Sequence, residues 1–128
     1  IIKKIKSNIP KYSKIITPPY FYCFRELLNN YDIYFQEHDD GNFMLGSKKI
    51  YEKFKSRMND LSFSYLTLPS SMTGLNTTLI RENWLKLEKK DFKNIRSKSF
   101  QYLLTEASHD INLKILFEDD KWKIYEIN

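Results

Sequence analysis

The stretch Ile111-Asn112-Leu113-Lys114-Ile115-Leu116-Phe117-Glu118-Asp119-Asp120-Lys121-Trp122-Lys123-Ile124-Tyr125-Glu126-Ile127 decides the predicted fold. Alternate positions from 111 to 117 are apolar, which predicts a strand with one buried face. Asp119-Asp120 predicts a turn, and the β-favouring residues from 122 to 127 predict a second strand. The stretch therefore predicts a β-hairpin whose last strand is packed in a sheet, with Trp122 largely buried.

Four elements are predicted between residues 47 and 108. Residues 99–108 form a strand that completes a three-stranded antiparallel meander from Phe100 to Ile127. Residues 78–95 suit a helix or a two-faced strand, and helix propensity favours the helix. Residues 47–58 repeat apolar side chains at every fourth position, which predicts a helix, and residues 61–68 alternate like a strand.

Thr17-Pro18-Pro19 predicts the start of a long helix over residues 20–35, since a hydroxyl and prolines suit a first turn. Cys23 lies in this helix, where we expect it to be a small buried apolar residue. The predicted buried face consists of Tyr20, Phe24, Leu27, Leu28, Tyr31 and Phe35.

Aromatic residues make up 16% of the 128-residue chain, against only three Gly and four Pro, which favours a folded chain of one domain. So many aromatics exceed what a small core readily hides. We expect the surplus to line a cavity or form an exposed patch that binds a protein partner or an apolar ligand. The candidates, each beside the apolar stripe of its element, are Tyr12, Tyr34, Tyr51 and Tyr65.

The net charge of +5 comes mostly from residues 1–16, which we predict to be a basic arm preceding a single domain over residues 17–128. Removal of residues 1–14 is expected to leave the fold nearly intact, because the arm has no sustained apolar periodicity. No stretch is apolar enough for a transmembrane segment. The first residue is Ile and not Met, so an anchor on a longer chain stays open.

Two groups of basic residues are candidate contacts for an anion or for nucleic acid. The second lies within residues 81–98, where Trp84, Phe92 and Phe100 are interspersed, as in surfaces that grip single-stranded nucleic acid. Interleaved acidic residues favour an ordinary solvated face instead. The candidate contacts are Lys3, Lys4, Lys6, Lys11, Lys14, Lys89, Lys90, Lys93 and Arg96.

Chemistry-bearing motifs are not evident in the sequence. His38 and His109 each precede an aspartate in a predicted surface turn and lack a second ligand at metal-binding spacing. Ser70 and Ser71 have no nucleophile-elbow pattern, and the three glycines form no phosphate loop. We expect no metal and no cofactor. An enzyme with an aromatic pocket stays open as an alternative, with Tyr20, Phe24, Tyr31, Trp84 and Trp122 as its lining.

The aromatic helix over residues 20–35, the helix introduced by Gly46-Ser47, and the closing run from Phe117 to Ile124 together resemble the nuclear transport factor 2-like, or SnoaL-like, superfamily. The resemblance implies a cone of curved antiparallel sheet wrapped on helices around a pocket. The superfamily includes enzymes and domains that only bind, so it does not choose between them.

The predicted fold is α+β, with helices packed on one face of a curved antiparallel sheet that ends in a C-terminal β-meander. The predicted function is that of a non-catalytic binding or assembly domain, acting through a protein partner or an apolar ligand. The alternatives are a nucleic-acid-binding module, which would use the basic arm and the face from Arg81 to Lys98, and a small-molecule enzyme with an aromatic pocket.

Overall fold

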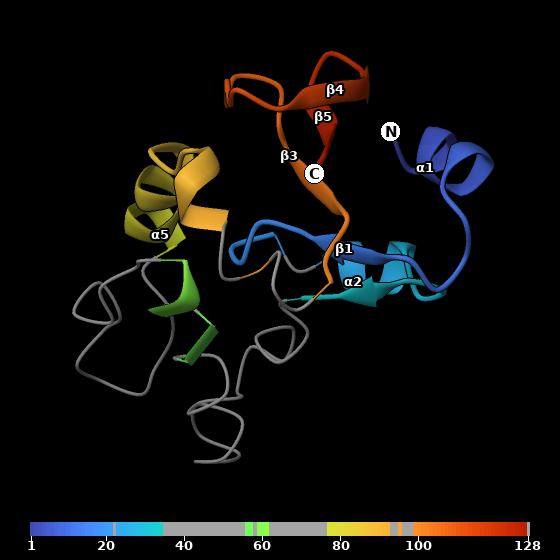
Figure 1. Ribbon diagram of the computed structural model, residues 1–128, viewed down its shortest axis with the longest axis horizontal. Helices are drawn as coiled ribbons and strands as arrows, with labels where there is room; N and C mark the ends of the chain where they lie inside the picture. The colour runs from blue at the N-terminus through green and yellow to red at the C-terminus, as the bar shows by residue number, and fades with distance from the viewer. Residues whose placement is uncertain are drawn as a thin grey trace.

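The computed structural model describes residues 1–21, 23–34, 56–57, 59–61, 77–92, 95 and 99–127. The elements of these residues, drawn in Figure 1, are α1 (Ile2–Asn8), β1 (Lys14–Ile16), α2 (Cys23–Leu27), β2 (Asp32–Ile33), α5 (Thr77–Leu85), the 3₁₀ helix η3 (Lys89–Phe92), β3 (Tyr102–Glu106), β4 (Lys114–Glu118) and β5 (Trp122–Glu126). The fold is therefore α+β, as predicted.

Within the described residues, a sheet of five strands joins both ends of the chain in the order β2-β1-β3-β5-β4. β1 is parallel to β2 and to β3, while β5 is antiparallel to both β3 and β4. The sheet is thus mixed and not wholly antiparallel. The three C-terminal strands are neighbours as expected, but β5 lies between β3 and β4, so the last strand is more central than in a simple meander.

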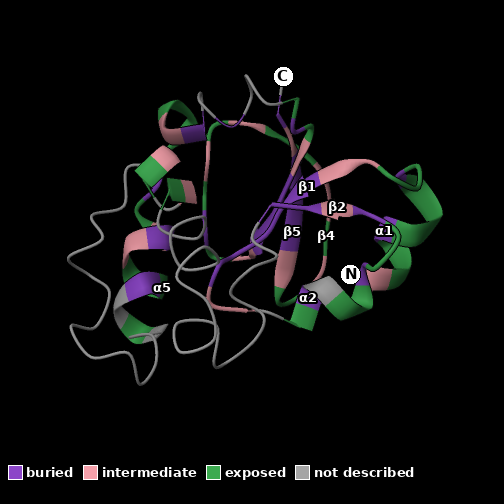
Figure 2. Ribbon diagram, turned by 90° about the horizontal axis from the view of Figure 1, so that it is seen from below, coloured by how far each residue is buried: buried purple, intermediate pink, exposed green. Residues whose placement is uncertain are grey.

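Helices cover both faces of the sheet, not the single face that the sequence predicts. Figure 2 shows α5 on one side of the strands and α1 and α2 on the other. Successive residues of a strand point to opposite faces, and the central strands are buried on both. Ile15, Leu104 and Ile124 lie in the cluster beneath α1 and α2, and Ile16, Leu103 and Tyr125 lie in the cluster beneath α5 and η3.

The C-terminal hairpin is confirmed by the pairing of β4 with β5, but its predicted buried face is interrupted. The register shifts between Ile115 and Phe117, which marks a β-bulge in β4. A bulge adds one residue to a strand and turns the following side chains toward the other face. Leu113 accordingly packs on the cluster beneath α5, Phe117 packs on the opposite cluster, and Ile115 is exposed.

The long helix predicted over residues 20–35 is wrong. Among the described residues of this range, 20–21 and 23–34, only α2 is helical, and a turn at residues 28–30 leads into β2. The helix does not continue because the following backbone pairs with β1 and with the turn that precedes β1. In that turn, the backbone N–H of Tyr12 donates to the carbonyl of Asn30 at 2.7 Å. Tertiary pairing thus overrides helix propensity. Leu27 and Cys23, both expected to be buried, are exposed.

Residues 1–16, which the sequence predicts to be a basic arm, pack with the rest of the chain. β1 lies in the middle of the sheet, between β2 and β3. Ile5 and Ile9 bury their side chains in the cluster beneath α1, and the hydroxyl of Tyr31 donates to the carbonyl of Ile9 at 2.9 Å. Burial of isoleucines at the spacing of one helical turn is what fixes α1 on the sheet.

The remaining predicted elements have mixed outcomes. α5 confirms the predicted helix over its first half, and β3 confirms the predicted strand. Most of the predicted helix over residues 47–58 and nearly all of the predicted strand over residues 61–68 lie outside the described residues.

Candidate functional site

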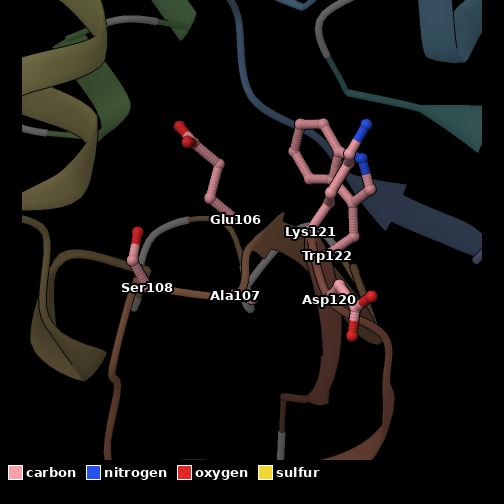
Figure 3. A pocket seen from close by; sticks show the side chains of 6 residues that line it. All are labelled: Glu106, Ala107, Ser108, Asp120, Lys121 and Trp122. Carbon is pink, nitrogen blue, oxygen red and sulfur yellow. The ribbon is translucent and has the colours of Figure 1, made fainter.

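A cavity of about 310 Å³ opens at one end of the sheet, where the turn after β3 meets the turn between β4 and β5. The antiparallel pairing of Glu106 with Trp122 brings these two turns together, because it places the end of β3 beside the start of β5. The lining residues, labelled in Figure 3, are Glu106, Ala107, Ser108, Asp120, Lys121 and Trp122.

Trp122 forms the apolar wall of this cavity and is held from two directions. The carboxylate of Asp119 accepts hydrogen bonds from the backbone N–H groups of Lys121 and Trp122 at 2.9 and 2.8 Å, a local bond that shapes the turn. The indole ring packs against the rings of Phe21 and Phe24, with centroids 5.0 and 4.9 Å away. Trp122 is therefore half-buried, less than predicted, and its orientation is fixed.

Glu106 stands on the other side of the cavity in a three-residue cluster drawn from different elements. Arg81 of α5 donates from Nε and from a terminal nitrogen to the two carboxylate oxygens, both at 2.8 Å. The hydroxyl of Tyr20 donates to the same carboxylate. A bidentate pair of this kind fixes the geometry as well as neutralising the charge.

The cluster sets the protonation of its members. Burial alone would raise the pKa of Glu106, but the hydrogen bonds from Arg81 and Tyr20 outweigh it and lower that pKa. Burial and the neighbouring carboxylate raise the pKa of Tyr20 well above its ordinary value. At neutral pH Glu106 is thus an ionised acceptor and Tyr20 a neutral donor. Neither has the pKa near 7 that suits a general acid or base.

A buried polar network lies beneath the turn that follows β3. The indole Nε1–H of Trp84 donates to the hydroxyl oxygen of Thr105 at 2.8 Å, and this oxygen lies 2.8 Å from Nδ1 of His109. The other ring nitrogen of His109 lies 2.9 Å from the carbonyl oxygen of Leu87. Burial lowers the pKa of His109. The residue is therefore a core histidine and not part of the surface turn that the sequence predicts.

Two contacts to β5 fix the loop that follows β3. The hydroxyl of Tyr125 donates to the carbonyl of His109 at 2.8 Å. The ammonium of Lys123, whose side chain is only 3% exposed, pairs with Asp110 at 2.6 Å. Burial alone would lower the pKa of Lys123, but the bond to Asp110 outweighs it and raises that pKa. The loop and its cavity-lining residues are thereby tied to the sheet.

The four predicted tyrosines have different surroundings. Tyr12 is 80% exposed. Tyr34 is a core residue, with its hydroxyl donating to Asp60 at 2.7 Å and its ring meeting the edge of Phe100 at 5.0 Å. Tyr51 and Tyr65 lie outside the described residues. The described pair does not form a common patch, because one side chain is at the surface and the other is in the core.

The predicted basic contacts also fall into separate groups. Lys3, Lys4, Lys6 and Lys11 are exposed on or just after α1, and Lys14 lies at the start of β1 with its ammonium 5.7 Å from the ring centre of Phe100. Lys89 and Lys90 are exposed on η3. Lys93 and Arg96 lie outside the described residues. α1 and η3 pack on opposite faces of the sheet, so these two groups do not share one surface.

Of the residues proposed for an aromatic enzyme pocket, Trp122 alone lines the cavity. Tyr20 adjoins it through Glu106. The other three are buried in the hydrophobic clusters: Phe24 and Tyr31 in one and Trp84 in the other.

Sequence reasoning missed the polar residues of the cavity, namely Glu106, Ser108, Asp120 and Lys121. The predicted meander gives no signal for them, because it pairs residues 99–108 with residues 111–117, whereas the structure pairs β3 with β5. A strand ending near residue 106 that runs antiparallel to one starting at residue 122 places their flanking turns side by side. Glu106 and Ser108 lie at the polar end of the predicted strand over residues 99–108, and Asp120 and Lys121 resemble ordinary turn residues.

Comparison with protein-family models, with curated proteins and with solved structures finds no match for this chain. Within the described ranges, no three His, Cys, Asp or Glu residues are grouped as a metal site would require. None of the helices in those ranges has the length and apolar character of a membrane span.

Proposed function

We propose that this chain is a non-catalytic binding domain and that the cavity between the turns at residues 106–108 and 120–122 is its ligand site. The observation that carries the proposal is the fixed indole of Trp122 facing a small set of polar groups across a cavity of about 310 Å³. Ligand sites are concave, apolar on one wall, and supplied with a few placed polar groups. The volume suits a small molecule or a single side chain of a protein partner.

The electrostatics of the site support binding over chemistry. Glu106 is held in its ionised form by Arg81, and Tyr20 is held in its neutral form. His109, the histidine among the described residues, uses both ring nitrogens in buried hydrogen bonds and so has no free nitrogen to act as a base. Of these groups Glu106 lines the cavity, and its hydrogen bonds to Arg81 and Tyr20 fix its position and its charge, which favours recognition.

The two tryptophans allow a direct test by NMR. Their indole Nε1–H signals report on different places, since Trp122 lines the cavity and Trp84 is buried against Thr105. Small ring-containing compounds, with benzyl alcohol as the first probe, should shift the Trp122 signal and leave the Trp84 signal unchanged. Shifts confined to other parts of the protein would contradict the proposal.

A matched pair of variants checks the location. Ala107→Leu places a larger side chain in the cavity lining and should weaken binding of every probe. Gln101→Leu adds the same side chain to an exposed position before β3 and should not. Equal effects of the two substitutions would place the ligand elsewhere.

A further inference from the structure

The charged side chains that line the cavity do not all point to the same side. Figure 3 shows the side chains of Glu106 and Lys121 projecting to the same side, while Asp120 projects the opposite way. The backbone N–H of Lys121 is bonded to Asp119, but its ammonium has no partner among the described residues. Among the described lining residues, the unpaired charge on the cavity side is therefore positive.

The negative charge of Glu106 does not neutralise the positive charge of Lys121, because Glu106 is already paired with Arg81. Both carboxylate oxygens accept from the guanidinium at 2.8 Å, and one of them also accepts from Tyr20. A cationic ligand would have to compete with Arg81 for these oxygens and would also be repelled by Lys121. The site thus selects against ammonium groups.

Donors for an anion are available at the cavity. The ammonium of Lys121 has three N–H groups, and the hydroxyl of Ser108 contributes one more from the turn after β3. A carboxylate is acceptor-only and matches this set of donors. The indole of Trp122 supplies a flat apolar surface, on which a ring stacks favourably.

We propose that the cavity binds a small carboxylate carried on an apolar ring, with the ring against Trp122 and the carboxylate between Lys121 and Ser108. This inference rests on the proposed function and specifies its ligand class. The positive charge of Lys121 is the reason for expecting a carboxylate in the ligand, and the fixed indole of Trp122 is the reason for expecting an apolar ring.

Three probes of nearly equal size test the ligand class: benzoate, benzyl alcohol and benzylamine. Each is titrated into the intact protein near neutral pH, with the Trp122 indole signal as the readout and the Trp84 signal as an internal reference. Benzoate should bind at least about threefold more tightly than benzyl alcohol, the size of effect expected of an exposed ion pair, and benzylamine should bind most weakly. Added salt should reduce the advantage of benzoate.

A charge-matched pair of variants assigns the preference to one residue. Lys121→Gln should reduce benzoate binding by about two- to fivefold and leave benzyl alcohol binding unchanged. Lys89→Gln removes the same charge from η3, away from the cavity lining, and should change neither. An equal loss of benzoate binding in both variants would overturn the inference, because it would show a general charge effect.

The outcomes separate this inference from the function on which it rests. If benzyl alcohol or benzylamine binds at Trp122 as tightly as benzoate, the ligand class is wrong while the binding function stands. If no probe shifts the Trp122 signal, both are wrong.

Phenylpropanoate and N-acetylphenylalanine distinguish two kinds of ligand that carry both a carboxylate and an apolar ring. The first stands for a free aryl acid, and the second stands for a C-terminal Phe of a peptide. Tighter binding of one identifies the source. Failure of both to bind at Trp122 when benzoate does would overturn the carboxylate assignment, since the same donors should serve all three acids.

Discussion

His109 and Leu87 are joined by a hydrogen bond of 2.9 Å between the ring Nε2 and the carbonyl oxygen, and this bond fixes the tautomer of the ring. A carbonyl only accepts, so Nε2 carries the proton in the neutral imidazole. Nδ1 is then an acceptor for the hydroxyl of Thr105, whose oxygen in turn accepts from Trp84. Every polar atom of the network is satisfied only when His109 is neutral.

We expect the free energy of unfolding to fall as the pH drops below about 6.5, the ordinary pKa of histidine. Burial lowers the pKa of His109 in the folded state, so the unfolded chain takes up the proton first, which favours unfolding. The contribution is complete above the unfolded pKa and is lost as the pH falls toward the folded pKa, with a slope of at most about 1.4 kcal/mol per pH unit.

Urea unfolding at several pH values between 7.5 and 5 measures this slope. His109→Gln should flatten the profile in that range. His38→Gln, which removes the other histidine, serves as the control. The prediction is wrong if His109→Gln and the unmodified protein show the same pH dependence.

Thr105→Val should destabilise the protein by about 2 to 4 kcal/mol. Valine keeps the shape of threonine but removes the hydroxyl, and with it the buried hydrogen bonds that this oxygen makes with the indole N–H of Trp84 and with Nδ1 of His109. Thr105→Ser keeps the hydroxyl and should cost much less. Denaturant unfolding compares the two variants, and equal losses would show that packing, not the hydrogen bonds, matters here.

Ile15→Ala should cost about 2 to 5 kcal/mol, because the side chain is fully buried in β1 at the centre of the sheet. Ile115→Ala is the matched control on the edge strand β4, where the side chain is 45% exposed, and it should cost less than about 1 kcal/mol. Thermal or urea unfolding gives both values. Similar losses at the two positions would contradict the central place of β1.

Arg81→Gln should raise the pKa of Glu106, because burial would then act without the opposing bidentate pair. The cost in stability should stay at or below about 1 kcal/mol, since about half of the Arg81 side chain is exposed. Carboxyl ¹³C NMR follows the titration of Glu106, and Lys86→Gln on the same part of the chain is the control. An unchanged pKa would show that Tyr20 alone holds the carboxylate.

Tyr12→Asn should leave the protein as stable or stabilise it by several tenths of a kcal/mol. Tyr12 has a φ of 68°, in the left-handed region that asparagine tolerates better than bulky residues. Its ring is exposed, so little packing is lost. A clear loss of stability in thermal unfolding would reveal a contact that outweighs the strain.

The C-terminal hairpin could be predicted because its signals are local. The alternation and turn residues from 111 to 127 predict a hairpin, and the hairpin is present. The bulge between Ile115 and Phe117 could not be predicted, since nothing in the alternation marks the extra residue. The resemblance to the nuclear transport factor 2-like superfamily stays a prediction.

The N-terminal third could not be predicted because tertiary pairing decides it. The apolar stripe that suggested one long helix is divided between α2, a turn and β2, and the turn is held by β1. For the same reason the isoleucines at positions 5, 9 and 15 looked like sparse apolar residues on a basic arm. These isoleucines share one core because strands from both ends of the chain pair in the same sheet.

The parallel pairing of Ile15 with Tyr102 also determines how the chain must fold. The hairpin of β4 and β5 closes a loop of a few residues, whereas the centre of the sheet closes one that spans most of the sequence. Pairing two segments that are distant in the sequence costs chain entropy before the stabilising contacts form. Such pairings therefore slow folding. We therefore expect the docking of β1 against β3 to be the kinetic bottleneck, with folding in milliseconds to seconds and Ile15→Ala acting mainly on the folding rate.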